Sequence, residues 1–178
     1  FARAVGGSGA VLPSGVRLVR AAAGVASGPF RLGRSLDRPF VHLHTGGSTG
    51  RPQAWAKTPR NLLAEAALHA ERHGLGPADR IVATVTPRHI YGLLFSVVVP
   101  LVSGAAVARA TPFFPAAIGA ALARHRATVL VTVPAHVRAL ARTSWTGRLR
   151  LALSSTAPLD AADALGFAER AGIGIEEI

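Results

Sequence analysis

The sequence contains no cysteine and no methionine. Without cysteine, this chain can hold no disulfide, no thiolate metal site and no cysteine nucleophile. Acidic residues are also scarce, with 9 Asp and Glu against 20 Lys and Arg, so the formal net charge is +11. All but one of these basic residues are arginines, and they are dispersed without the basic runs that mark nucleic-acid patches. We therefore expect no nucleic-acid partner, although a basic nucleic-acid-binding domain stays open as an alternative function.

Long hydrophobic runs are missing too. The most apolar stretch, residues 91–108, is interrupted by Ser96, Pro100 and Gly104, whereas a membrane span needs about 20 mostly apolar residues. The N-terminus has no secretory signal pattern. We expect no membrane partner and a cytoplasmic location. Because the chain begins with Phe1 rather than Met, we also expect it to be part of a longer polypeptide.

Strand and helix patterns alternate from residue 40 onward. Residues 40–44 alternate as a strand, residues 53–57 form a second short strand, and Thr58 and Pro59 begin a helix that ends at Gly74. Further strands are predicted over 80–85, 105–109, 127–133, 149–154 and 173–178, with helices over 89–103, 115–125, 134–142 and 160–171. The pattern predicts an α/β fold, a mostly parallel sheet with flanking helices. Residues 1–39 are expected to be an irregular lead-in or truncated subdomain, and 40–178 one partial domain.

The loop after the first strand has the composition of an anion-binding turn. Residues 45–51 contain three glycines, three hydroxyls and one arginine. Glycines allow backbone amides to approach a ligand closely, and successive amides form a concave nest for anions. The loop lacks the Gly-x-x-x-x-Gly-Lys-Ser/Thr pattern of a P-loop, since Arg51-Pro52 follow the last glycine. A polar hairpin linker stays open as the alternative interpretation.

Three polar loops follow predicted strands, at residues 45–50, 86–89 and 154–156. In open parallel sheets, ligands bind beyond the carboxyl ends of the strands. We therefore expect these three loops to share one site.

The loop sequence Thr45-Gly46-Gly47-Ser48-Thr49-Gly50-Arg51-Pro52-Gln53 is similar to the Thr-Ser-Gly-Ser/Thr-Thr-Gly-x-Pro-Lys signature of the adenylate-forming (AMP-binding, acyl/aryl-CoA synthetase-like) superfamily. Residues 86–92, Thr-Pro-Arg-His-Ile-Tyr-Gly, resemble its Pro-x-x-His-x-x-Gly segment. Residues 153–159, Leu-Ser-Ser-Thr-Ala-Pro-Leu, resemble its Ser-Gly-Gly-Ala-Pro-Leu segment. The resemblance covers residues 40–178.

This resemblance implies part of the large N-terminal domain of an enzyme that uses ATP to activate a small carboxylic acid as an acyl-adenylate. The acyl group then passes to a thiol, of coenzyme A or of an acyl-carrier protein. His89 is the implied catalytic residue, as a hydrogen-bond donor or gate near the carboxylate, although a histidine satisfied by backbone at a helix entry stays open. The implied cofactor-binding residues are Thr45, Gly46, Gly47, Ser48, Thr49, Gly50, Arg51, Lys57, Ser155, Thr156, Ala157 and Pro158.

The chain departs from the family pattern at three points. Gln53 replaces the lysine that closes the signature, and Lys57 or Arg51 would supply the missing positive charge. A loop with glutamine at this position resembles that of the aryl-polyene-type AMP-ligase branch. Ser155 and Thr156 replace two glycines. The Tyr-Gly-x-Thr-Glu segment, with the glutamate that binds Mg²⁺, is expected beyond residue 178. We expect this chain to be inactive alone, and a non-catalytic remnant that binds nucleotide or a partner stays open as a further alternative.

The remaining polar and aromatic residues are interpreted as structural, and no metal site is expected within the chain. His69 and His73 lack the His-Glu-x-x-His pattern and are expected on a solvated helix face. The other structural residues are His42, His44, Trp55, Trp145, Tyr91, Gly92, Asp37, Asp79, Asp160 and Asp163.

Overall fold

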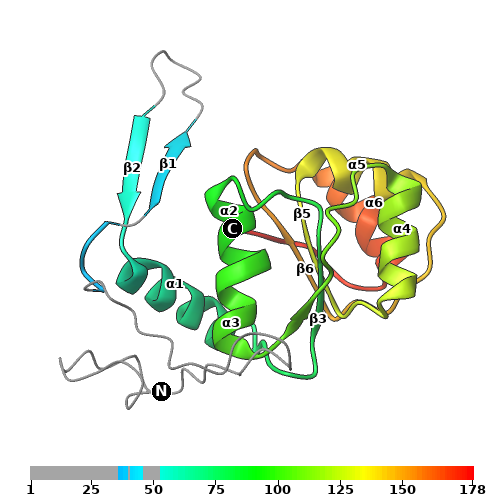
Figure 1. Cartoon of the computed structure of the whole chain (residues 1–178). Coiled ribbons are helices and arrows are strands. Elements are labelled where there is room, and N and C mark those ends of the chain that lie inside the picture. The colour runs from blue at the N-terminus through cyan, green and yellow to red at the C-terminus, as the bar shows by residue number, and fades with distance from the viewer. Residues whose placement is uncertain (1–35, 40, 46–52) are drawn as a thin grey trace.

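The computed structural model describes residues 36–39, 41–45 and 53–178 of the chain, and within it a parallel sheet lies between two helical layers (Figure 1). The five strands run in the order β4-β3-β5-β6-β7 and pair in parallel throughout. Their bounds are β3 Arg80–Ala83, β4 Ala106–Val107, β5 Val129–Thr132, β6 Leu151–Ser154 and β7 Glu176–Glu177.

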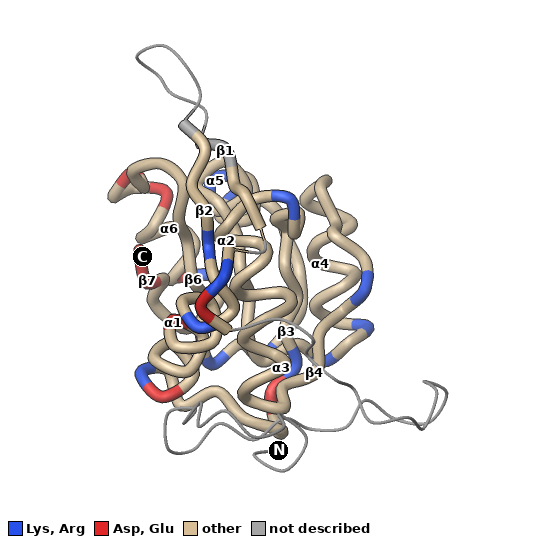
Figure 2. The backbone as a smooth tube through the Cα atoms, turned by 60° about the vertical axis from the view of Figure 1, so that its left-hand side comes forward, with Lys and Arg blue, Asp and Glu red and all other residues tan. Residues whose placement is uncertain are grey.

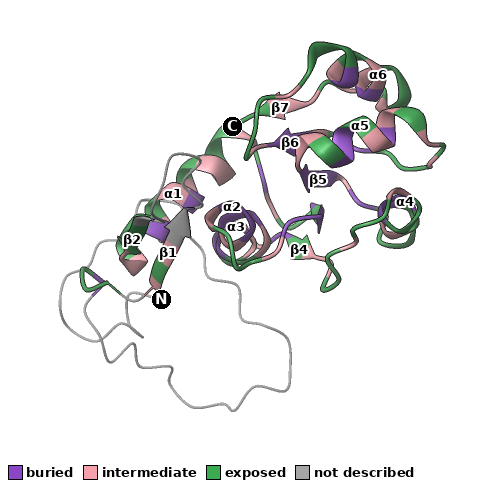
Figure 3. Ribbon diagram, turned by 90° about the horizontal axis from the view of Figure 1, so that it is seen from above, coloured by how far each residue is buried: buried purple, intermediate pink, exposed green. Residues whose placement is uncertain are grey.

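Helices cover both faces of this sheet. On one side lie α1 Pro59–Arg72, α2 Ile90–Leu93, the π-helix η1 Leu94–Val98 and α3 Val99–Ser103. On the other side lie α4 Pro115–Arg124, α5 Pro134–Arg142 and α6 Ala161–Ala171 (Figure 3). The predicted α/β class, with a mostly parallel sheet and flanking helices, is confirmed. No helix among the described residues is long and apolar enough to cross a bilayer.

Successive side chains along each strand point to opposite faces of the sheet, so the hydrophobic core consists of two clusters, one on each face. In β5, Val129 and Val131 pack with the α1–α3 layer, whereas Leu130 packs with the α4–α6 layer. All three side chains have no exposed surface. This double burial is why the parallel strands are almost continuously apolar in sequence.

The first two strands form a separate sheet, which corrects the sequence analysis. β1 Val41–Thr45 and β2 Gln53–Lys57 pair antiparallel as a hairpin, with Leu43 opposite Trp55. The argument from the carboxyl ends of one parallel sheet therefore applies to β3 and β6 but not to β1. The reason is chain length: a parallel return requires a crossover of a dozen or more residues, and only residues 46–52 separate these two strands.

Helix α1 begins where its sequence predicts. The Thr58 hydroxyl accepts a hydrogen bond from the amide of Asn61, the Asn61 side chain accepts one from the amide of Thr58, and Pro59 occupies the first helical position. The helix ends at Arg72, and Gly74 follows with φ of +58°.

Residues 90–103 form the helical segment expected over 89–103, but a π-turn interrupts it at η1. Pro100 has no amide hydrogen to give to the carbonyl four residues earlier, and the amide of Val99 instead reaches back five residues to the carbonyl of Leu94. The hydroxyl of Ser96 donates to the carbonyl of Gly92 at 2.6 Å. Gly104, at φ of +78°, ends the segment.

A charged network joins the segments at the amino edge of the sheet. Arg150 binds both carboxylate oxygens of Asp79, at 2.7 and 2.6 Å, and also the carbonyls of His73 and Gly74 at the end of α1. The Thr128 hydroxyl donates to Asp79 as well. Burial alone would raise the pKa of Asp79, but the hydrogen bonds from Arg150, Gly76 and Thr128 outweigh it and hold the pKa below its usual value.

His69 of α1 and His73 at its C-terminal cap are half-buried rather than solvated, so that expectation was wrong. The His73 side chain is 3% exposed, and its ring stacks on that of His69 with centroids 5.7 Å apart. The His69 ring also packs against Phe95. The helix face that carries both rings is covered by η1 and by Glu176 of β7, whose carboxylate lies 3.5 Å from His73 Nδ1.

The two tryptophans differ in how far their side chains are packed against the rest of the protein. Trp145 packs as expected, stacked on Phe167 with its indole N–H donated to the carbonyl of Leu140. Trp55, expected in the packing, is 55% exposed on the hairpin. A two-stranded sheet has no second layer to bury such a side chain.

Acid is expected to destabilise the fold through the two stacked histidines. Burial is the main cause that lowers the pKa of both rings, so the folded state binds fewer protons than the unfolded state once the pH falls below the ordinary histidine value of about 6.5. Stability should therefore be full above that value and fall progressively below it. Urea unfolding at several pH values should show a shallower acid loss for His69→Leu. The exposed His42→Gln should match the parent, and an unchanged slope in His69→Leu would contradict this account.

Substitution of Gly92 by alanine is expected to destabilise the start of α2. An added Cβ would lie 2.0 Å from the carbonyl oxygen of Thr86, a contact that requires backbone movement and costs about 1–3 kcal/mol. Gly76→Ala is the matched control, because a Cβ there meets nothing within 4 Å. Equal urea midpoints for the two variants would show that the close approach does not constrain the loop.

Candidate functional site

A row of buried hydroxyls lies at the carboxyl edge of the parallel sheet. Thr132 and Ser154 are paired in register at the ends of β5 and β6, and the amide of Thr84 extends the ladder from β3 to the carbonyl of Val131. Each follows a residue that packs toward α1–α3, so all three side chains lie on the face covered by α4–α6. Their exposed fractions are 6% for Thr84 and 0% for Thr132 and Ser154.

His136, in the first turn of α5, completes this row. Its Nδ1 lies 2.8 Å from the Thr84 hydroxyl, which lies 2.9 Å from the Thr132 hydroxyl. The Ser154 hydroxyl is buried and has no hydrogen-bond partner among the described residues. Burial lowers the pKa of His136, so the ring is held neutral.

The loop before α2 is held in place by two residues of that helix. Tyr91 donates its hydroxyl to the carbonyl of Leu153 at 3.0 Å, and its burial raises the pKa of the phenol. Gly92 packs directly on the carbonyl of Thr86. Tyr91 and Gly92 are therefore packing residues, as predicted. His89 precedes the helix with an exposed side chain that makes no capping hydrogen bond, and its amide donates to the carbonyl of Thr86.

The loop after β6 contains a strained residue. Thr156 has φ of +86°, a left-handed conformation that a β-branched residue rarely adopts. It lies at the position of the second glycine in the Ser-Gly-Gly-Ala-Pro-Leu motif, which residues 153–159 resemble. Ser155 is turned away from the loop tip, since its hydroxyl donates to the carbonyl of Ile178 at 2.6 Å. Thr156, Ala157 and Pro158 are exposed.

The structure brings two of the three expected loops to one sheet edge. The loops after β3 and β6 both lie at the carboxyl edge of the parallel sheet. The hairpin rises beside α1, and the carboxyl end of β1 points toward the same end of the molecule as the start of α2 (Figure 1). Thr45 is its last residue; Gly46, Gly47, Ser48, Thr49, Gly50 and Arg51 lie outside the described residues.

Lys57 forms an ion pair with a residue of α1. Its ammonium lies 3.7 Å from the carboxylate of Glu65 on α1. The described residues contain no group of three His, Cys, Asp or Glu side chains arranged to hold a metal ion. Basic residues are spread along the tube rather than gathered on one element (Figure 2).

Sequence reasoning missed Thr84, Thr132 and His136, and it included Ser154 only as the first residue of the loop 154–156. A signal was available: each of the three hydroxyl residues directly follows three apolar residues, the last of which are Ala83, Val131 and Leu153 respectively. Polar side chains at the last position of neighbouring buried strands gather at one edge of the sheet. His136 had no signal of its own, because its role depends on the register of β3 against β5.

Comparisons with known proteins agree with this geometry. The family model described as AMP-binding enzyme matches residues 21–178. A sulfoacetate–CoA ligase of Cupriavidus necator is 35% identical over 144 residues, which cover 79% of this chain and 28% of the relative. A 3-hydroxybenzoate–CoA/4-hydroxybenzoate–CoA ligase of Thauera aromatica is 36% identical over 102 residues, 56% of this chain and 19% of the relative.

Among solved structures, MatB from Rhodopseudomonas palustris with ATP bound superposes with a TM-score of 0.73 at 26% identity, covering 81% of this chain and 29% of that one. The sheet and its helices are thus those of an N-terminal domain of adenylate-forming enzymes. The chain belongs to the AMP-binding enzyme family, and it spans less than a third of the length of these relatives.

Replacement of Thr156 by glycine is expected to stabilise the domain. The left-handed conformation costs an ordinary residue roughly 1–2 kcal/mol, while glycine adds about 0.5–1 kcal/mol of unfolded-state entropy. The free energy of unfolding should therefore rise by up to about 1.5 kcal/mol. The neighbouring Ala157→Gly, where φ is not positive, should instead lower it. Chemical denaturation of both variants tests the strain, and a loss of stability in Thr156→Gly would refute it.

Proposed function

We propose that this chain is the part of an acid–thiol ligase that binds ATP and a small carboxylic acid. The observation that carries the proposal is the match of the AMP-binding family model across residues 21–178. The curated relatives are named as CoA ligases, and a structural neighbour holds ATP. The loop after β1, the start of α2 and the loop after β6 would together form the site.

The residues of the proposed site suit a polyphosphate. Thr45, Ser48, Thr49, Gly50 and Arg51 would hold the β- and γ-phosphates through amides, hydroxyls and one guanidinium, with Gly46 and Gly47 allowing close approach. Lys57 pairs with Glu65 in this structure, so a role at the phosphates requires that pair to exchange partners. The described elements on either side of this loop, β1 and β2, are both strands, so the proposal assigns phosphate binding to the loop's own donors.

The other two loops would hold the acid and the adenine. His89 is exposed and free of a capping bond at the start of α2, where it would donate a hydrogen bond to the reacting carboxylate. Thr156, Ala157 and Pro158 would line the adenine and acyl walls. Ser155 would contribute through its backbone, since its hydroxyl is bonded to Ile178.

The proposed chemistry has two steps. A carboxylate oxygen attacks the α-phosphorus of ATP, the bond to the bridging oxygen breaks, and pyrophosphate leaves with its electron pair. A thiol of coenzyme A or of an acyl-carrier protein then attacks the acyl carbon, and AMP leaves. Positioning and charge stabilisation dominate such steps. The Mg²⁺ ligand is proposed to lie outside this chain. The aryl-polyene-type branch stays a prediction based on Gln53.

Pyrophosphate exchange tests the proposal. The complete gene product containing this chain should exchange labelled pyrophosphate into ATP only when a suitable acid is added, and residues 1–178 alone should not. Replacement of both Ser48 and Thr49 by alanine should reduce exchange by about 100-fold or more, because each of the two hydrogen bonds to a charged oxygen contributes roughly 1.5–3 kcal/mol. The exposed Thr111→Ala is the control.

Two outcomes would count against this function. Absence of exchange over a broad acid panel, with ATP still bound, would favour a non-catalytic nucleotide-binding remnant. DNA affinity that falls steeply with salt, without ATP affinity, would favour a nucleic-acid binder.

A further inference from the structure

The hydrogen bonds around His136 determine which ring nitrogen carries its proton. Thr132 has no exposed surface, and its hydroxyl contacts only that of Thr84 among the described residues. If His136 donated from Nδ1 to Thr84, and Thr84 donated to Thr132, the Thr132 proton would be buried without an acceptor. That arrangement is costly, because an unmade buried hydrogen bond forfeits the full desolvation penalty.

The opposite direction gives both threonine hydroxyl protons an acceptor. Thr132 donates to Thr84, Thr84 donates to Nδ1 of His136, and Nδ1 acts as an acceptor. Burial keeps the ring neutral, so its one hydrogen lies on Nε2. Thr84 and Thr132 are thus positioning residues, and His136 offers a neutral donor at the carboxyl edge of the sheet.

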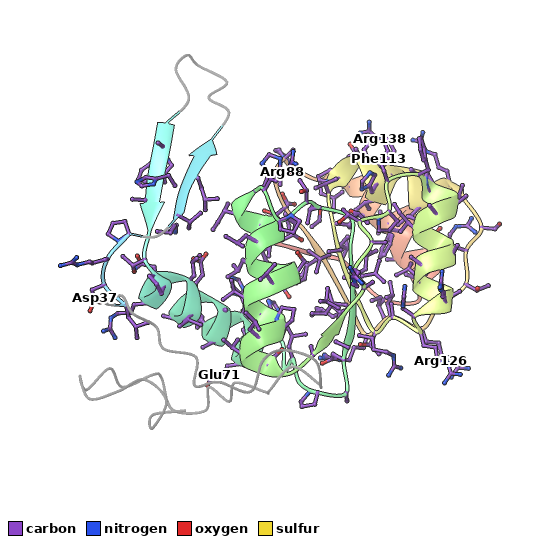
Figure 4. The ribbon with its side chains drawn as sticks, in the orientation of Figure 1. Asp37, Glu71, Arg88, Phe113, Arg126 and Arg138 are labelled. Atoms are coloured by element: carbon purple, nitrogen blue, oxygen red, sulfur yellow. The ribbon has the colours of Figure 1, made fainter. Side chains whose placement is uncertain are left out.

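His136 is itself 8% exposed, and its ring borders exposed aromatic side chains. Phe113 packs edge-on against the His136 ring with centroids 5.2 Å apart, and it packs edge-on against Phe114 as well. These phenylalanines are 67% and 71% exposed. Phe113 lies at the same end of the molecule as Arg88, which directly precedes His89 (Figure 4). The β1–β2 hairpin lies on the opposite side of the sheet, beside α1 (Figure 1).

We propose that His136 is a specificity-determining residue that donates a hydrogen bond from Nε2 to a neutral oxygen on the apolar body of the acid substrate. This inference rests on the proposed function. The position favours the acid over the triphosphate, because β1 and β2, which flank the proposed phosphate loop, lie on the opposite side of the sheet (Figure 1). The exposed Phe113 ring suits an aryl or other apolar body, and a neutral imidazole favours a hydroxyl or carbonyl oxygen over a second carboxylate.

The tautomer is tested first, by ¹⁵N–¹H correlation spectra of the histidine rings. His136 should show an unprotonated Nδ1 and a protonated Nε2. Thr132→Val should increase the Nδ1-protonated form, and Thr132→Ser should restore the parent spectrum. Ser154→Ala is the matched control, since it removes a hydroxyl of the same row that has no partner among the described residues. A parent spectrum with protonated Nδ1 would overturn the proposal.

Selectivity is tested with pairs of acids in the complete gene product, for example benzoate and 4-hydroxybenzoate, by pyrophosphate exchange. His136→Leu should lower the ratio of kcat/KM for the oxygen-bearing acid to that for its partner by about tenfold, chiefly through KM. His136→Gln should restore part of it. If His136→Leu does not fold, Thr132→Val should shift the ratio in the same direction.

The outcomes separate two kinds of failure. An active parent whose acid ratio is unchanged in the folded His136 variants, or in Thr132→Val, would overturn the role of His136 alone. A parent that activates no acid would remove the proposed function and this inference with it.

Discussion

The double burial of β5 is the constraint on which the described structure depends. Its side chains pack against helical layers on both sides of the sheet, with no exposed surface at any of its four residues. A strand in this position accepts polar side chains only where they are hydrogen-bonded. Thr132 meets that condition at the last position, where the strand ends and Thr84 is within reach. Polar chemistry is thereby confined to one edge of the sheet.

The sequence predicted most elements because their ends are marked by local chemistry. Helix α5 has the predicted bounds, with Pro134 at its first position, and Asp160 caps α6 through the amides of Ala162 and Asp163. The sheet to which β1 belongs was not predictable from alternation, which is the same in parallel and antiparallel strands. Burial of His69 and His73 depended on Glu176, which is distant in the chain, and on the packing of η1.

The candidate site, too, was predictable from the sequence only in part. Its loops were found through local motifs, and the fold brings two of them to one edge of the sheet. The His136 donor could not be found locally, since it requires the register of β3 against β5 and the placement of α5 above both. Thr156 shows a further limit: the motif locates the residue, but only backbone angles reveal that it holds a conformation typical of glycine.

The network of Asp79 and Arg150 has a consequence for which parts of the domain can vary in sequence. It clamps the end of α1, the start of β3 and the start of β6 together at the amino edge, while the carboxyl edge carries the loops. The charged side chains that tie α1 to the sheet therefore lie at the edge opposite the loops. Sequence changes in the loops can alter what the domain binds while this attachment of α1 stays in place.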